Sequence, residues 1–134
     1  MRQATNASRE APLVLGSRHQ VSGLNSRFNG GQPAFSDYVA YHREMIARAH
    51  PATDAALLEK IIAGNAPFEL KPAPGFSVGR SKPYARGIVL THGLSDSPYF
   101  VRYLAEFFQA QGFRVMAVLL PGHGTRPGDL LDVK

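Results

Sequence analysis

The sequence contains no cysteine, and this absence excludes several kinds of site. Without thiols the chain forms no disulfide, no thiolate metal site and no active site with a cysteine nucleophile. It also has no apolar run near the roughly 20 residues that a membrane-spanning helix needs. The longest apolar piece of the N-terminus, residues 12–15, is too short for the core of a signal peptide. We therefore expect a cytoplasmic protein without a membrane span, although an N-terminus rich in Arg and Ser is also typical of a weak organelle-targeting segment.

Charged residues are scarce as well, at 19% of the 134 residues, while hydrophobic residues make up 44%. This balance is typical of a globular chain with one domain. The net charge of +5 lies mostly in residues 1–34, which hold four arginines against one glutamate. No basic stripe is interleaved with aromatic residues, so we expect no nucleic-acid partner. Because residues 1–34 lack periodicity and end in the chain breakers of residues 29–33, we expect a flexible N-terminal extension.

Residues 35–65 predict a helical hairpin with one apolar side. Ser36 is a candidate cap for the first helix. The second helix is expected to begin at Thr53 or Asp54 and to stop at Gly64. The apolar positions at helical spacing are Tyr38, Tyr41, Met45 and Ile46 in the first helix and Leu57, Leu58, Ile61 and Ile62 in the second.

Residues 66–134 change to short extended pieces and one further helix. Strands are predicted over residues 68–70, 88–91 and 113–120, and a helix over residues 98–111. The order strand, helix, strand predicts a βαβ unit with a parallel pair, which places the chain in the α/β class. The buried stripe of the helix is expected at Val101, Leu104, Ala105 and Phe108.

Two glycine-containing loops follow the strands of this predicted parallel pair. In the first, His92-Gly93-Leu94, glycine lets the backbone approach a ligand closely, and the N–H of Leu94 is free to donate. Fixed donors of this kind stabilise a tetrahedral oxyanion by about 3 kcal/mol each. The second loop, residues 121–125, lies at the carboxyl end of its strand, where ligands bind in open α/β sheets. It lacks the lysine and the length of a phosphate-binding P-loop.

These two loops occur in the order and spacing of a known family. Residues 87–99 read GIVLTHGLSDSPY, and residues 119–125 read LLPGHGT. The chain from residue 66 onward resembles the amino-terminal part of the α/β-hydrolase fold, most closely carboxylesterases, monoacylglycerol lipases and serine aminopeptidases. Residues 66–70 are similar to the lead-in to the early strands of that family. The resemblance implies a small-molecule or lipid ester as substrate, and we expect no cofactor and no metal.

The resemblance also implies roles for individual residues. The backbone N–H of Leu94 is expected to be one oxyanion-hole donor, with His92 and Gly93 shaping its loop. The second donor, the nucleophilic serine, the acid and the catalytic histidine are expected later in the family order, after Lys134. We therefore expect residues 66–134 to be a partial hydrolase domain that ends before the nucleophile elbow, inactive alone, in which the strand over residues 88–91 has an open edge.

Several polar residues match parts of a serine-hydrolase site in sequence but are not expected to be catalytic. Residues 75–79 match the G-x-S-x-G pattern of a nucleophile elbow. Such an elbow needs a strand before the serine and a helix after it, and the prolines on both sides of Ser77 are incompatible with these elements. Ser95 and Asp96 are adjacent and cannot form a relay without an intervening base. We expect Asp96 or Ser97 to cap the helix that follows.

The five histidines are not expected to be general bases or metal ligands. His92 and His123 lie in the two loops, where a structural role is the preferred interpretation. His19, His42 and His50 lack the spacing of ligands, and we expect them at the surface.

Two alternatives to a serine hydrolase remain open. The chain could be a non-catalytic interaction protein that retains a partial hydrolase fold and self-associates through its exposed strand edge. It could also belong to a hydrolase with an aspartate nucleophile, of the epoxide hydrolase or dehalogenase type, because the missing elbow residue decides the chemistry.

Overall fold

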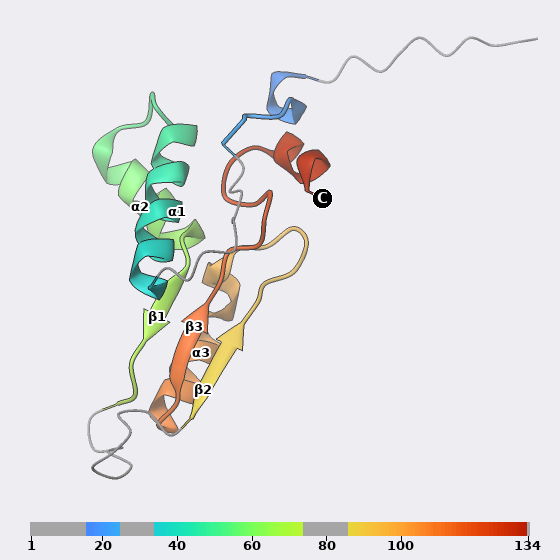
Figure 1. Cartoon of the computed structure of the whole chain (residues 1–134). Coiled ribbons are helices and arrows are strands. Elements are labelled where there is room, and N and C mark those ends of the chain that lie inside the picture. Colours follow the sequence, from blue (N-terminus) through green and yellow to red (C-terminus); the bar gives the residue numbers. More distant parts are fainter. Residues whose placement is uncertain (1–15, 25–33, 74–85, 134) are drawn as a thin grey trace, which may run out of the picture.

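The computed structural model describes residues 16–24, 34–73 and 86–133, and Figure 1 shows how their elements are arranged. A small sheet packs against one helix, and a pair of helices lies near the end to which the parallel strands point. No helix in these described ranges is long and apolar enough to cross a bilayer. The elements are η1 (Ser17–His19), α1 (Phe35–Ala49), α2 (Ala55–Asn65), β1 (Phe68–Leu70), β2 (Gly87–Leu90), η2 (Pro98–Val101), α3 (Arg102–Ala110), β3 (Arg114–Ala117) and η3 (Pro127–Asp132), where η denotes a 3-10 helix.

Helices α1 and α2 form the predicted hairpin and pack against each other. Asp54 is the cap of α2, and its carboxylate accepts hydrogen bonds from the backbone N–H groups two and three residues further on. The cap of α1 is Ala34 rather than the predicted Ser36, because Ser36 already lies within the first turn. Helix α2 also continues one residue past Gly64, to Asn65.

The buried side of the hairpin forms one core with the chain that leaves the sheet. Met45, Ile46 and Ile62 are buried as predicted, together with Ala66 and Leu119. Leu119 follows β3, so this core connects the hairpin to the second of the two glycine loops.

Three residues of the hairpin lie on the opposite side from the predicted one. Tyr41 and Leu57 are 52% and 50% exposed, although their spacing indicated burial. His42 is buried rather than at the surface, and its Nδ1 lies 2.8 Å from the backbone carbonyl oxygen of Tyr38. Burial lowers the pKa of His42, while the Tyr38 carbonyl opposes that change. A histidine with a partner one turn away can therefore replace an apolar residue on the buried side.

The sheet has the strand order β1-β3-β2, and β2 and β3 are parallel, which confirms the predicted βαβ pair. Their register places Ile88 opposite Val115 and Leu90 opposite Ala117. Strand β1 joins the other side of β3 in the antiparallel direction. Helix α3 packs on the face that carries Leu90 and Val115, and Ala105 of α3 is buried between them. The sheet is thus covered by α3 on one face.

The segment predicted as one helix over residues 98–111 divides into η2 and α3. Leu104 is largely exposed rather than buried, because α3 turns Ala105 toward the sheet. The hydroxyl of Ser97 does not cap this helix; it donates to the carbonyl of Gly64 at 2.8 Å and joins the start of η2 to the end of α2.

Strand β2 lies at the edge of the sheet, as predicted. Val89 at its centre is 61% exposed, on the face opposite α3. Residues 74–85, which include Ser77 and precede β2, lie outside the described residues.

Residues 16–24 correct the expectation that all of residues 1–34 form a flexible extension. Helix η1 packs against η3, and Figure 1 shows the blue segment beside the dark red helix. Ser22 hydrogen-bonds to Asp129, which lies 107 positions away in the sequence. The hydrophobic periodicity of the residues around Ser22 cannot indicate a partner so far away in the sequence.

The hydroxyl of Tyr38 fixes α1 to the chain just before the second glycine loop. It donates to the carbonyl of Leu119 at 2.8 Å and accepts from the N–H of the same residue at 3.1 Å. Burial raises the pKa of Tyr38, and the hydrogen bond with the Leu119 backbone works in the other direction.

Tyr38→Phe should therefore lower the free energy of unfolding by about 1–3 kcal/mol, because both backbone groups of the buried Leu119 lose that partner. Urea denaturation followed by circular dichroism measures the change. Tyr41→Phe is the matched control on the same helix, since Tyr41 is exposed, and should stay within about 0.5 kcal/mol of the wild type. Equal effects of the two substitutions would show that the Tyr38 hydroxyl has no anchoring role.

Candidate functional site

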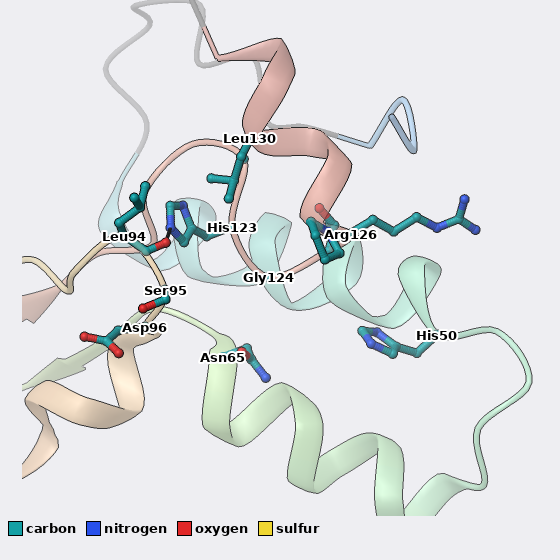
Figure 2. Close-up of a pocket in the computed structure, with 12 residues that line it drawn as sticks. His50, Asn65, Leu94, Ser95, Asp96, His123, Gly124, Arg126 and Leu130 are labelled. Carbon is teal, nitrogen blue, oxygen red and sulfur yellow. Dashed lines mark hydrogen bonds between the residues drawn. The ribbon is translucent and has the colours of Figure 1, made fainter. Parts of the chain in front are cut away.

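The two glycine loops meet at one pocket of about 530 Å³, shown in Figure 2. The loop after β2 forms one side, and the loop after β3 with η3 forms another. The ends of α1 and α2 complete the lining. The lining residues are His50, Asn65, Leu94, Ser95, Asp96, Gly122, His123, Gly124, Thr125, Arg126, Pro127 and Leu130.

The carbonyl group of the peptide bond between Gly93 and Leu94 has two hydrogen-bond partners, which fix the orientation of this peptide. The Gly93 oxygen accepts from the backbone N–H of Asp96 at 3.2 Å and lies 2.9 Å from Nδ1 of His92. Because the peptide is trans, the N–H of Leu94 points to the opposite side. Within the described part of the chain this N–H makes no hydrogen bond, and the Leu94 side chain is 77% exposed at the pocket. The loop thus presents an unpaired donor.

His92 is buried beneath this loop, and its protonation state follows from its partners. Its Nε2 accepts from the backbone N–H of Leu120 at 3.1 Å, so the proton of the neutral ring lies on Nδ1, which donates to Gly93. Burial lowers the pKa of His92 and the nearby His123 lowers it further, while the Gly93 carbonyl and Asp96 oppose this. With both ring nitrogens occupied, His92 holds the loop in position and is not available as a general base.

His123 joins the two loops directly. Its Nε2 lies 2.7 Å from the carbonyl oxygen of Leu94, and its Nδ1 lies 3.0 Å from that of Pro121. Its ring also packs against the ring of His92, with 4.7 Å between the centroids. The peptide before Leu94 is therefore held by one histidine and the peptide after it by the other. Figure 2 shows the His123 ring directed at Leu94.

The second loop depends on glycine at two positions. Gly122 and Gly124 both have φ of +78°, a conformation that other residues rarely adopt. A Cβ on Gly124 would lie 2.9 Å from a side-chain carbon of Leu119 and 3.3 Å from one of Ile46. The loop therefore packs closely on the hairpin core.

Asp129 in η3 is fully buried behind the pocket wall. Its carboxylate accepts from the N–H and the hydroxyl of Ser22, each at 2.6 Å, from the Thr125 hydroxyl, and from the N–H of Arg126 at 3.3 Å. Burial alone raises the pKa of Asp129, but the hydrogen bonds from Ser22, Thr125 and Arg126 outweigh it and hold the pKa below its ordinary value. The ionised carboxylate is thus part of the folded structure.

Because its pKa is lowered in the folded state, Asp129 contributes stability that is present above the ordinary Asp value of about 3.9 and is lost as the pH falls through the lowered pKa. Asp129→Asn should lower the free energy of unfolding at pH 7 by about 2–3 kcal/mol. The difference between variant and wild type should shrink below about pH 4, since the carboxylate is then protonated first in the unfolded chain and, at still lower pH, in the folded protein. Urea titrations at several pH values measure this. A difference that is constant from pH 3 to pH 7 would contradict it.

Several residues that line the pocket were not predicted from the sequence. His50 was expected at the surface, yet it is half-buried at the end of α1, where its Nδ1 lies 2.9 Å from the Ile46 carbonyl oxygen. Asn65 donates to the carbonyl of Ile61 at 2.8 Å and faces the same hollow. Asp129, which lies behind the wall and does not line the pocket, had a local signal, since an acidic residue two positions after proline is typical of a helix start.

In a serine-hydrolase site the nucleophilic serine hydroxyl is hydrogen-bonded to a histidine. Ser95 and Asp96 line the pocket, but in residues 16–24, 34–73 and 86–133 no serine hydroxyl is hydrogen-bonded to a histidine. The same residues hold no group of three side chains that could bind a metal ion. What the pocket does offer is the backbone of Leu94, whose N–H makes no hydrogen bond within the described residues, together with apolar lining such as Leu130.

Comparisons of this chain with protein-family models, with curated proteins and with solved structures find no match.

Proposed function

We propose that this chain supplies the oxyanion-binding loop of a serine hydrolase that acts on carboxylic esters. The observation that carries the proposal is the Gly93–Leu94 peptide: its carbonyl is held by His92 and by the N–H of Asp96, its N–H makes no hydrogen bond within the described residues, and Leu94 lines the pocket. The resemblance of residues 87–99 and 119–125 to α/β-hydrolases supports the same conclusion.

In this mechanism a serine hydroxyl passes its proton to the catalytic histidine that the resemblance implies outside residues 1–134 and attacks the carbonyl carbon of the bound ester. The π electrons of the carbonyl move onto its oxygen, where negative charge develops. The N–H of Leu94 donates to that oxygen as the charge forms. Because His92 and His123 hold the peptides on either side of Leu94, the donor needs no reorientation during the reaction. A donor fixed in this way is worth about 2.7–4 kcal/mol of transition-state stabilisation.

The nucleophile in this proposal is a serine outside residues 1–134, on a strand–serine–helix elbow that lies beside the free edge of β2. A fluorophosphonate probe for activated serines tests it. The product of the full reading frame that contains this sequence should be labelled at one such serine, and residues 1–134 alone should not be labelled. Labelling at Ser77 or Ser95 would overturn the assignment of the nucleophile, and absence of labelling and of ester hydrolysis in both proteins would overturn the proposed function.

A second candidate, an interaction protein, is favoured by exposed aromatic side chains on η2 and α3. Tyr99, Phe100, Tyr103 and Phe107 are all more than half exposed, and Val89 is exposed on the opposite face of the sheet, in the edge strand β2. Large exposed apolar surfaces mark contact sites. A stable dimer of residues 1–134 in sedimentation equilibrium, without hydrolysis by the full reading-frame product, would favour this candidate. Turnover of an epoxide or a haloalkane without serine labelling would instead indicate an aspartate nucleophile.

A further inference from the structure

The N-terminal segment of residues 16–24 lies against η3, the helix that carries part of the pocket lining. Ser22 donates both its N–H and its hydroxyl to the carboxylate of Asp129, each at 2.6 Å. The same carboxylate accepts from Thr125 and Arg126, which line the pocket. One buried side chain thus connects the N-terminal segment to the pocket wall.

A second contact is independent of this carboxylate. A Cβ placed on Gly128 would lie 2.4 Å from the carbonyl oxygen of His19 and 2.6 Å from the carbonyl carbon of Gln20. The backbone of the segment therefore lies directly on the backbone of η3, with no room for a side chain between them. Gly128 has no positive φ, so this close approach rather than backbone conformation requires glycine.

We propose that residues 16–24 are a clasp that sets the position of the pocket wall formed by Thr125, Arg126, Pro127 and Leu130, with Asp129 as the positioning residue between the two. The loop of Leu94 has two anchors: His92 holds the Gly93 carbonyl, and His123 of the second loop holds the Leu94 carbonyl. Release of the clasp should therefore loosen one wall of the pocket, including the His123 contact, while His92 still holds the peptide that carries the proposed oxyanion donor. The N-terminal segment belongs to the site although it does not line it. This inference does not rest on the proposed function, because it concerns the wall and not the reaction.

Gly128→Ala tests the clasp, since alanine suits the conformation of η3 but collides with His19 and Gln20. Hydrogen–deuterium exchange of residues 1–134, read by mass spectrometry, should be faster by about tenfold in residues 16–24 and also in residues 122–131. Exchange in α1, β2 and α3 should remain unchanged. Gly64→Ala is the control, because nothing lies within 4 Å of the added Cβ, and it should change neither region.

Ser22→Ala is a milder variant that still tests the clasp if Gly128→Ala destabilises the whole chain. It removes one of the two hydrogen bonds from the clasp and should accelerate exchange in the same two regions by a smaller factor. Faster exchange in residues 16–24 with no change in residues 122–131 would overturn the proposal, as would no change in either region. Ester hydrolysis is not part of the readout, so loss of the proposed function leaves this result interpretable.

Discussion

Leu94→Pro should lower kcat for ester hydrolysis by about 100- to 1,000-fold in the product of the full reading frame, because proline has no backbone N–H to donate. The preceding residue is Gly93, which lacks the Cβ that would otherwise clash with the proline ring. The carbonyl of Leu94 remains available to His123. The substitution therefore removes the proposed donor and preserves the contacts around it.

Leu94→Ala is the matched control, because it shortens the same exposed side chain and retains the N–H. It should change kcat by no more than a few fold, and both variants should keep the wild-type melting temperature within a few degrees. Steady-state kinetics on a short acyl ester measures the pair. If the two variants lose activity equally, the side chain or the loop as a whole matters and the N–H is not the donor.

Gly122→Ala should lower the free energy of unfolding by about 2–4 kcal/mol. Gly122 has φ of +78°, and an added Cβ would lie 2.7 Å from a side-chain carbon of Val133 and 3.0 Å from the carbonyl oxygen of Asp129. Neither the backbone of η3 nor the turn itself can move aside without disturbing the pocket wall. The backbone strain at positive φ and the steric collision of the added Cβ therefore both reduce the free energy of unfolding.

Gly23→Ala separates these two contributions. Gly23 has a similar φ of +73°, but nothing lies within 4 Å of its added Cβ. It should lower the free energy of unfolding only by the conformational penalty of about 1–2 kcal/mol. Chemical denaturation of both variants gives the comparison, and a Gly122→Ala effect no larger than that of Gly23→Ala would contradict the close packing of the second loop.

Sequence patterns correctly predicted the elements that are determined by residues close together in the sequence, such as a helix cap or a run of apolar residues. The carboxylate of Asp54 caps the helix that begins at the next residue, and continuous apolar residues predicted a strand over residues 113–120, of which β3 occupies only Arg114–Ala117. The parallel pairing of β2 with β3 followed from the helix between them, and it brings Leu94 and His123 to one pocket. This adjacency could be expected because the carboxyl ends of parallel strands lie at the same edge of a sheet.

What local patterns missed depends on partners far away in the sequence. The side of α1 that is buried is decided by Leu119, so Tyr38 and His42 face inward while Tyr41 does not. Residues 16–24 are ordered by Asp129, and nothing around Ser22 indicates this. The histidines could be assigned a structural role, but their partners, Leu120 for His92 and Leu94 for His123, required the fold.

The amide proton of Leu94 reports directly on whether its N–H binds the oxyanion, and nuclear magnetic resonance can observe it in the phosphonyl adduct of the full reading-frame product. The adduct carries an oxygen in the place of the oxyanion, so we expect this proton to move downfield on labelling as it forms a charge-assisted hydrogen bond. The amide signal of Leu104, which is outside the pocket, should not move. An unchanged Leu94 signal in a fully labelled, inactive protein would show that this N–H is not an oxyanion donor.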